Sequence, residues 1–177
     1  EGFWRACEEE MDMLNSMSSW EIQRKPHETK IFGSTWVFKI KRFPDGRMRK
    51  IKARICVRGD HQTEGVDFFD TYAPVVQWST IRLMLILTVV LNLKTDQVDY
   101  TAAFLHAELD EEIYMYMPRG FTQPGMVYKL KKSLYGLKQS PRNFFMLLKD
   151  KLLQLNFKQS QRDPCLFINK DIIIIVY

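Results

Sequence analysis

Two basic segments with alternating hydrophobicity, separated by a turn signal, constrain the fold of this chain more than any other feature. Residues 36–41 and 50–58 alternate apolar and charged side chains, and Pro44-Asp45-Gly46 lies between them. Alternation with period two is typical of a β-strand, and Asp-Gly is typical of a hairpin turn. The pattern therefore predicts a β-hairpin with two unlike faces. The apolar face comprises Trp36, Phe38, Ile40, Ile51, Ala53, Ile55 and Val57, and the basic face comprises Lys39, Lys41, Lys50, Lys52, Arg54 and Arg58.

The positive charge of the chain is concentrated in this hairpin. The chain carries 26 Lys and Arg against 21 Asp and Glu, for a net charge of +5. Residues 39–58 hold nine basic residues and one acid, so this segment is +8 and the remainder is −3. A solvated face is the alternative, but like charges on paired strands repel each other, which favours a polyanion partner. Six phosphate contacts would give binding a log–log salt dependence with a slope of about −5.

The overall composition excludes several classes of protein. Hydrophobic residues make up 46% and aromatic residues 13% of the chain, which is too apolar for a disordered tail. No apolar run approaches the roughly 20 residues of a membrane span, so we expect no membrane partner. Cys7, Cys56 and Cys165 lie far apart with no metal-binding spacing, which favours reduced thiols in an intracellular protein.

The remaining pattern predicts an α+β fold with a mainly antiparallel sheet and packed helices. Helices are expected over 3–17, 79–92 and 140–156, and the second is apolar nearly all round, which predicts deep burial. Residues 23–34 and 59–74 are expected to be loops. Strands are expected over 97–100, 112–117, 127–130, 166–168 and 172–177.

One carboxylate stands out because of its surroundings. Asp99 lies between Val98 and Tyr100 at the end of a predicted core strand, just before two alanines. A carboxylate in such a place is costly unless it is exposed or bound to a cation. From the residues alone, an ordinary turn or capping aspartate is the more frequent explanation.

A series of short motifs, taken together, carries a family resemblance over nearly the whole chain. The motifs are STWVFK (34–39), DG (45–46), KAR (52–54), RG (58–59), Gln62, GVD (65–67), APVV (73–76), TIR (80–82), VDYTAAFL (98–105), EIYM (112–115), PRGF (118–121), KSLYGLKQ (132–139), PR (141–142), Asp163 and Phe167. In this order they resemble the reverse transcriptase domain of copia-type retrotransposon polyproteins.

The resemblance implies the fingers and partial palm of a right-hand polymerase, with residues 1–95 mostly fingers and 96–177 mostly palm. It implies RNA-directed DNA polymerisation, in which deoxynucleotides are added to a primer on an RNA or DNA template with two Mg²⁺ ions. The implied partners are the template-primer, the dNTP and the rest of a longer polyprotein. The implied location is a cytoplasmic particle or the nucleus.

The resemblance also implies roles for individual residues. Asp99 corresponds to the first catalytic, metal-binding aspartate, and Phe104 corresponds to the steric gate that crowds a ribose 2′-hydroxyl. Three basic residues of the hairpin are candidate triphosphate ligands, without a choice among them, and two further residues line the nucleotide pocket. The ligands are Lys50, Lys52 and Arg54, and the pocket residues are Tyr135 and Gly136.

The family's second metal motif, Tyr-x-Asp-Asp, is reached only at its first residue, Tyr177. One carboxylate does not hold two Mg²⁺ ions, so these 177 residues alone are expected not to polymerise. Two alternatives remain open: a nucleic-acid-binding module without catalysis, and a decayed mobile-element remnant with no selected function.

Overall fold

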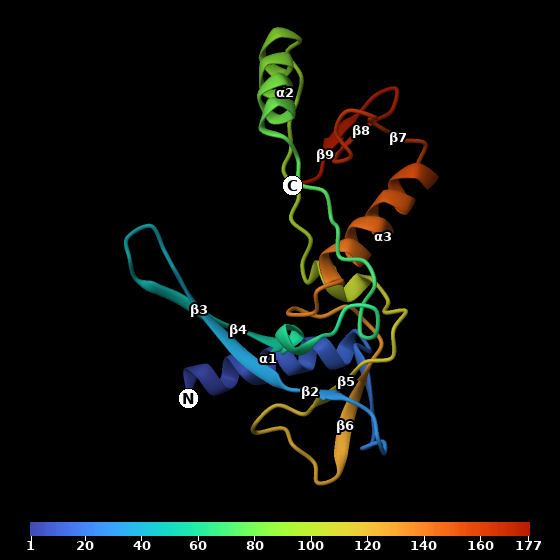
Figure 1. The fold of residues 1–177 in the computed structure, drawn as a ribbon. Helices are drawn as coiled ribbons and strands as arrows, with labels where there is room; N and C mark the ends of the chain where they lie inside the picture. Colours follow the sequence, from blue (N-terminus) through green and yellow to red (C-terminus); the bar gives the residue numbers. More distant parts are fainter.

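The basic hairpin forms as the alternation predicts. The computed structural model describes all 177 residues, and β3 (Ser34–Arg42) pairs with β4 (Met48–Val57) as an antiparallel two-stranded sheet. The register places Trp36 opposite Ile55 on one face and Lys39 opposite Lys52 on the other, where Arg54 lies opposite Val37. Both predicted faces are therefore confirmed within the strands, whereas Arg58 lies just beyond β4. Figure 1 shows the hairpin extending away from the rest of the chain.

Only the base of the hairpin is buried. Helix α1 (Gly2–Ser16) packs against β4 and covers Ala53, Ile55 and Val57 on the apolar face. Phe38, opposite Ala53, and Ile40, closer to the turn, belong to the same face but are exposed. The hairpin is thus anchored at one end, where the predicted N-terminal helix lies against it.

The main core lies between α1, the base of the hairpin and a four-stranded sheet. The sheet has the order β1-β6-β5-β2, and only the β2–β5 pair is parallel. Its members are β1 (Trp20–Arg24), β6 (Met126–Leu130), β5 (Tyr114–Tyr116) and β2 (Ile31–Phe32). Strands β5 and β6 confirm the prediction for 112–117 and 127–130. The expectation of an unbroken loop over 23–34 was wrong, because partner strands supply the pairing that the polar composition does not signal.

A second, smaller core surrounds the C-terminal elements. Helix α3 (Ser140–Gln154) packs over the antiparallel sheet β7 (Lys158–Gln159), β8 (Leu166–Ile168) and β9 (Ile173–Ile175). Phe145, Leu152 and Phe167 are buried in this core. The predicted helix and the two predicted strands are confirmed, and β7 adds a short strand that the sequence did not indicate.

The predicted second helix forms, but its predicted burial was wrong. Helix α2 (Trp78–Val90) contains no buried residue, and Val89 is 81% exposed. It stands away from the rest of the molecule (Figure 1), and Ile81 near its start packs against the second core. An apolar surface all round a helix is buried only where other elements reach it, and none of the described elements surrounds α2.

Three further findings define the fold class. The molecule is a mixed α+β structure with three α-helices and mainly antiparallel sheets. All three cysteines are free thiols, as expected. None of the helices combines the length and apolar character that crossing a membrane requires.

One buried carboxylate ties α2 to the second core. Asp163 is 2% exposed, and its Oδ atoms accept hydrogen bonds from the backbone N–H groups of Gln77 (3.0 Å) and Cys165 (2.9 Å). Burial raises the pKa of Asp163, but these bonds and one from the Thr80 hydroxyl outweigh burial, so the pKa lies below its ordinary value. The stabilising contribution is therefore present above pH about 4 and is lost as the pH falls through the lowered pKa.

We expect Asp163→Asn to destabilise the chain by about 1–3 kcal/mol, because one buried N–H group loses a charged acceptor. Denaturant unfolding at pH 7 measures this effect. The control is Asp171→Asn, in the exposed turn between β8 and β9, which is expected to stay within about 0.5 kcal/mol of the parent. Equal stability of the two variants would contradict the assignment.

Candidate nucleotide-binding site

The structure brings together residues from three distant segments at the base of the hairpin. The Arg54 guanidinium lies over the Tyr135 ring, with its Cζ 4.9 Å from the ring centroid, within the range of a cation–π contact. The Tyr135 ring in turn contacts Phe104, centroid to centroid 4.9 Å. Arg54 forms no ion pair, and its Nε is buried without a hydrogen-bond partner. Stacking on Tyr135 therefore holds the guanidinium in place without an ion pair.

Tyr135 reaches this position because two backbones cross closely. The N–H of Val57 donates to the carbonyl of Tyr135 (2.8 Å). Gly136 follows with φ +95°, and a Cβ atom there would lie 2.1 Å from the Val57 carbonyl oxygen. A Cβ atom on Gly59, at the start of the short 3-10 helix η1 (Gly59–His61), would lie 1.9 Å from the carbonyl oxygen of Gly136. The crossing therefore needs a glycine in each of the two segments, Gly59 in one and Gly136 in the other.

The other two predicted triphosphate ligands lie further out along β4. Lys52 is half-buried, and Lys50 is exposed and paired with Lys41. Burial, and then the neighbouring Arg54, lower the pKa of Lys52. At about 3.3 Å per residue, Lys50 lies roughly 13 Å along the strand from Arg54. Of the three basic residues, Arg54 is the one that the structure places against Tyr135.

A buried glutamate that the sequence analysis did not single out lies beneath these basic residues. Glu10 of α1 is 8% exposed, and the Ile55 N–H donates to its carboxylate. Burial raises the pKa of Glu10, while the charges of Lys52 and Arg54 act in the opposite direction. The pattern of α1 places residue 10 on the buried side of the helix, but an acidic residue there reads as solvent-exposed.

Asp99 lies at the edge of this region and not within it. The predicted strand over 97–100 is absent, and Asp99 is exposed in an irregular segment. Its neighbour Tyr100 contacts Phe144 (5.7 Å between centroids), which contacts Phe104 (6.4 Å) in the short 3-10 helix η2 (Ala103–His106). A row of aromatic rings thus connects the neighbour of Asp99 with Tyr135 and Arg54.

The same segment also touches the C-terminal strand region. The Gln97 side chain donates to the Tyr177 hydroxyl. Asp99, two residues after Gln97, therefore belongs to the part of the chain that meets the C-terminal residues. Figure 1 shows the C-terminus beside the segment that descends from α2.

The described residues do not form a complete metal site. No three potential ligands among His, Cys, Asp and Glu gather in one place. Asp99 offers a single hard oxygen donor group, whereas a site for two Mg²⁺ ions needs several such donors. The residues present therefore fit one part of such a site and not the whole.

Comparison with known proteins defines the class. Residues 17–177 match the family model described as reverse transcriptase (RNA-dependent DNA polymerase). The chain therefore belongs to the reverse transcriptase family, whose members generally use divalent metal ions. No solved structure matches the chain.

Three curated relatives show which kind of reverse transcriptase the chain resembles. The chain is 38% identical over 181 residues to the retrovirus-related Pol polyprotein from transposon TNT 1-94 of Nicotiana tabacum, covering 98% of the chain and 14% of the relative. It is 35% identical over 170 residues to the Pol polyprotein from transposon RE1 of Arabidopsis thaliana, covering 93% and 12%. It is 31% identical over 188 residues to the transposon Ty1-ER2 Gag-Pol polyprotein of Saccharomyces cerevisiae, covering 100% and 10%.

These matches confirm the predicted resemblance: the chain is reverse transcriptase sequence of the copia type. The chain spans between a tenth and a seventh of the length of these relatives. The roles of individual residues in the site stay predictions.

Proposed function

We propose that these 177 residues form the fingers and part of the palm of an RNA-directed DNA polymerase, with residues 1–95 mostly fingers and 96–177 mostly palm. The observation that carries the proposal is the stack of Arg54, Tyr135 and Phe104 at the base of a basic hairpin. In a reverse transcriptase chain, this stack combines a cation that forms no ion pair with two aromatic faces. That combination suits a nucleoside triphosphate, whose phosphates need positive charge and whose sugar and base need flat apolar walls.

The proposed roles follow from position. Arg54 and Lys52 bind the triphosphate, and Lys50 contributes from further along the strand. Tyr135 and Gly136 line the pocket, and Phe104 lies against the sugar where a ribose 2′-hydroxyl would collide. Asp99 is the carboxylate that takes part in divalent-metal binding at the reacting end of the nucleotide.

These residues by themselves are proposed to bind but not to catalyse. Nucleotidyl transfer needs an in-line arrangement of primer hydroxyl and α-phosphate with metal ions held by several oxygens. Asp99 supplies one carboxylate, so polymerisation needs further carboxylates beyond those that gather here.

The test uses a recessed primer–template and asks whether the next complementary dNTP, with Mg²⁺, stabilises the complex against a heparin challenge. We expect the complementary dNTP to raise the retained fraction, whereas a non-complementary dNTP does not. Equal retention with all four dNTPs would contradict templated nucleotide binding. Retention without any nucleotide would favour the second candidate function.

The second candidate is nucleic-acid binding without nucleotide selection, and it rests on the exposed basic face of the hairpin. Arg58 leaves this face, since it pairs with Asp60 (2.7 Å) and holds the pKa of that carboxyl at about 2. Five basic side chains then remain: Lys39, Lys41, Lys50, Lys52 and Arg54.

Five phosphate contacts predict a log–log salt slope of about −4.5 for duplex binding. Fluorescence anisotropy between roughly 50 and 200 mM salt measures the slope. We expect Lys50→Ala to reduce its magnitude by about one, while Arg58→Ala leaves it unchanged. A parent slope near zero would contradict both functions.

A further inference from the structure

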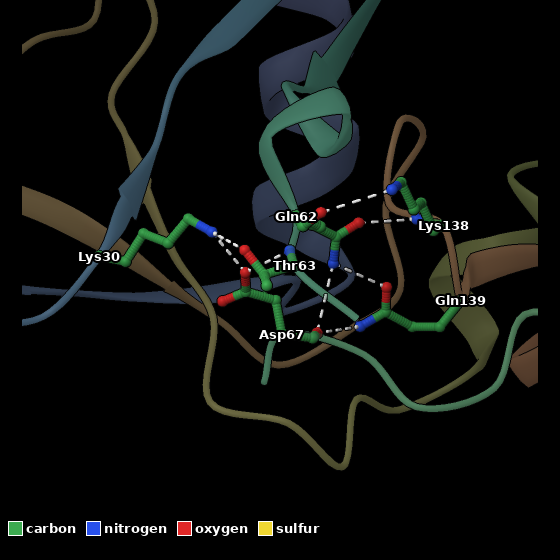
Figure 2. A network of polar contacts seen from close by, with 6 residues as sticks. All are labelled: Lys30, Gln62, Thr63, Asp67, Lys138 and Gln139. Atoms are coloured by element: carbon green, nitrogen blue, oxygen red, sulfur yellow. Dashed lines mark hydrogen bonds and ion pairs between the residues drawn. The ribbon is translucent and has the colours of Figure 1, made fainter. Parts of the chain in front are cut away.

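Two buried glutamine side chains form the centre of a polar network next to the proposed nucleotide pocket (Figure 2). Gln139 is 1% exposed and Gln62 is 6% exposed. A buried amide is costly unless its donors and acceptor are hydrogen-bonded. Neither glutamine belongs to the residues that were assigned a role above.

The nitrogen and the oxygen of both side-chain amides are hydrogen-bonded. Gln62 Nε2 donates to Gln139 Oε1 (3.0 Å), and Gln139 Nε2 donates to the Asp67 carbonyl (3.1 Å) and to Glu111 Oε2 (3.2 Å). Gln62 Oε1 accepts from the N–H of Lys138 (2.9 Å). The pair therefore fastens the loop that follows β4 to the segment that precedes α3.

The loop is itself closed by an ion pair at the surface. The Asp67 carboxylate accepts from the N–H of Thr63 (2.7 Å) and pairs with Lys30 Nζ (2.5 Å). Figure 2 shows the Lys30, Thr63 and Asp67 side chains meeting on one side of the glutamine pair. The Asp67 carbonyl, which Gln139 uses as an acceptor, is thus held in place from the other side.

The network helps to fix the segment that contains Tyr135 and Gly136. The segment is attached twice: at Tyr135 itself, through the backbone hydrogen bond from Val57, and further along, through the Gln62 contacts to Lys138 and Gln139. Without the glutamine contacts, the Val57 bond would be left as the nearer attachment of this segment. The position of the Tyr135 ring relative to Arg54 and Phe104 therefore depends on both attachments.

We propose that Gln62 and Gln139 are positioning residues for the nucleotide pocket: they hold Tyr135 and Gly136 at the level where Phe104 separates deoxyribonucleotides from ribonucleotides. This inference rests on the proposed function. It assigns no contact with the nucleotide to either glutamine, because both act through Tyr135.

The test compares the parent with Gln139→Met and Gln62→Met, which keep the side-chain volume and remove the hydrogen bonds. In the heparin-challenge assay, we expect the dNTP concentration for half-retention to rise about tenfold or more, because small displacements in a site are costly. We also compare the fraction of complex retained with the dNTP and with the corresponding ribonucleotide. The ratio of these two fractions is expected to fall toward one. Asp163→Asn, which removes a buried hydrogen bond in the other core, serves as the matched control and is expected to leave the ratio unchanged.

A second readout needs no nucleotide. The seven tyrosines are labelled with 3-fluorotyrosine, and Tyr135→Phe identifies the ¹⁹F signal of position 135. We expect both methionine variants to move this signal toward that of the exposed Tyr72, while Asp163→Asn leaves it in place. If the buried variants do not fold, Lys30→Met, which removes the Lys30 contacts with Asp67 and Thr63 at the edge of the network, is expected to shift the signal in the same direction.

The outcomes separate the two proposals. If the complementary dNTP does not stabilise the primer–template complex of the parent, the proposed function fails and the ¹⁹F signal alone decides the positioning role. If the methionine variants lose stability but neither the Tyr135 signal nor the deoxy-to-ribo ratio moves, the glutamines are structural only and the inference is overturned.

Discussion

Replacing Gly136 with alanine is expected to destabilise the chain by about 3 kcal/mol or more. Overpacking costs roughly 1–3 kcal/mol, and a side chain at positive φ adds roughly 1–2 kcal/mol. Both costs apply here, because φ is +95° and the new Cβ would lie 2.1 Å from the Val57 carbonyl oxygen. The obstacle is backbone in a β-strand, which cannot rotate away as a flexible side chain can. Denaturant unfolding of parent and variant measures the difference.

Two matched glycines separate these costs. Gly46, at the hairpin turn, has φ +85° but nothing within 4 Å of a built Cβ, so Gly46→Ala isolates the backbone cost at about 1 kcal/mol. Gly59 has no positive φ but would place its Cβ 1.9 Å from the Gly136 carbonyl oxygen, so Gly59→Ala isolates the overlap. We expect Gly136→Ala to cost the most and Gly46→Ala the least. A Gly136→Ala variant as stable as Gly46→Ala would show that the two backbones do not cross so closely.

Asp99→Asn is expected to abolish the stabilisation of the primer–template complex by complementary dNTP while leaving the fold intact. The loss should be at least about 10–100-fold in dNTP concentration, the range that even indirect disturbance of a metal ligand causes. The fold should be unaffected because Asp99 is exposed and outside regular structure. The heparin-challenge assay measures the first effect and denaturant unfolding the second.

Binding of the primer–template without nucleotide provides the control for Asp99→Asn. We expect its affinity and salt slope to remain those of the parent, because the hairpin supplies the charge for this binding. Unchanged dNTP stabilisation in Asp99→Asn would remove Asp99 from the proposed site, and the nucleic-acid-binding function would then remain. A simultaneous loss of primer–template binding would instead indicate damage to the structure.

The parts of the fold that the sequence predicted are those in which local pattern and tertiary surroundings agree. The hairpin follows from period-two alternation and the turn at Asp45-Gly46, and both faces formed as expected. Helix α2 also formed, but it is not buried as predicted. An apolar pattern shows which surface a helix could bury, but it does not show whether another element packs against that surface. Strands β1 and β2 were missed because strand pairing with β6 and β5, and not local composition, determines them.

The residues of the candidate site were likewise only partly predictable from the sequence. The motifs that carry the family resemblance contain Arg54, Phe104 and Tyr135, but only the three-dimensional structure shows that Arg54 and not Lys50 lies over Tyr135. Gln62 and Gln139 lie in those same motifs. They attracted no role because amide side chains in loops read as solvent-exposed, and their burial depends on the contact between segments 77 residues apart.

The exposure of α2 has a consequence for its motions. The helix has 13 residues, a length at which an isolated helix is only marginally stable in water. Its backbone amides should therefore exchange with solvent deuterium through local fraying, long before the strands of the main core open. Exchange should be slowest just after the first turn, from Ile81, whose N–H donates to the carbonyl of Gln77, because Asp163 fastens this end of the helix. It should quicken residue by residue toward Val90.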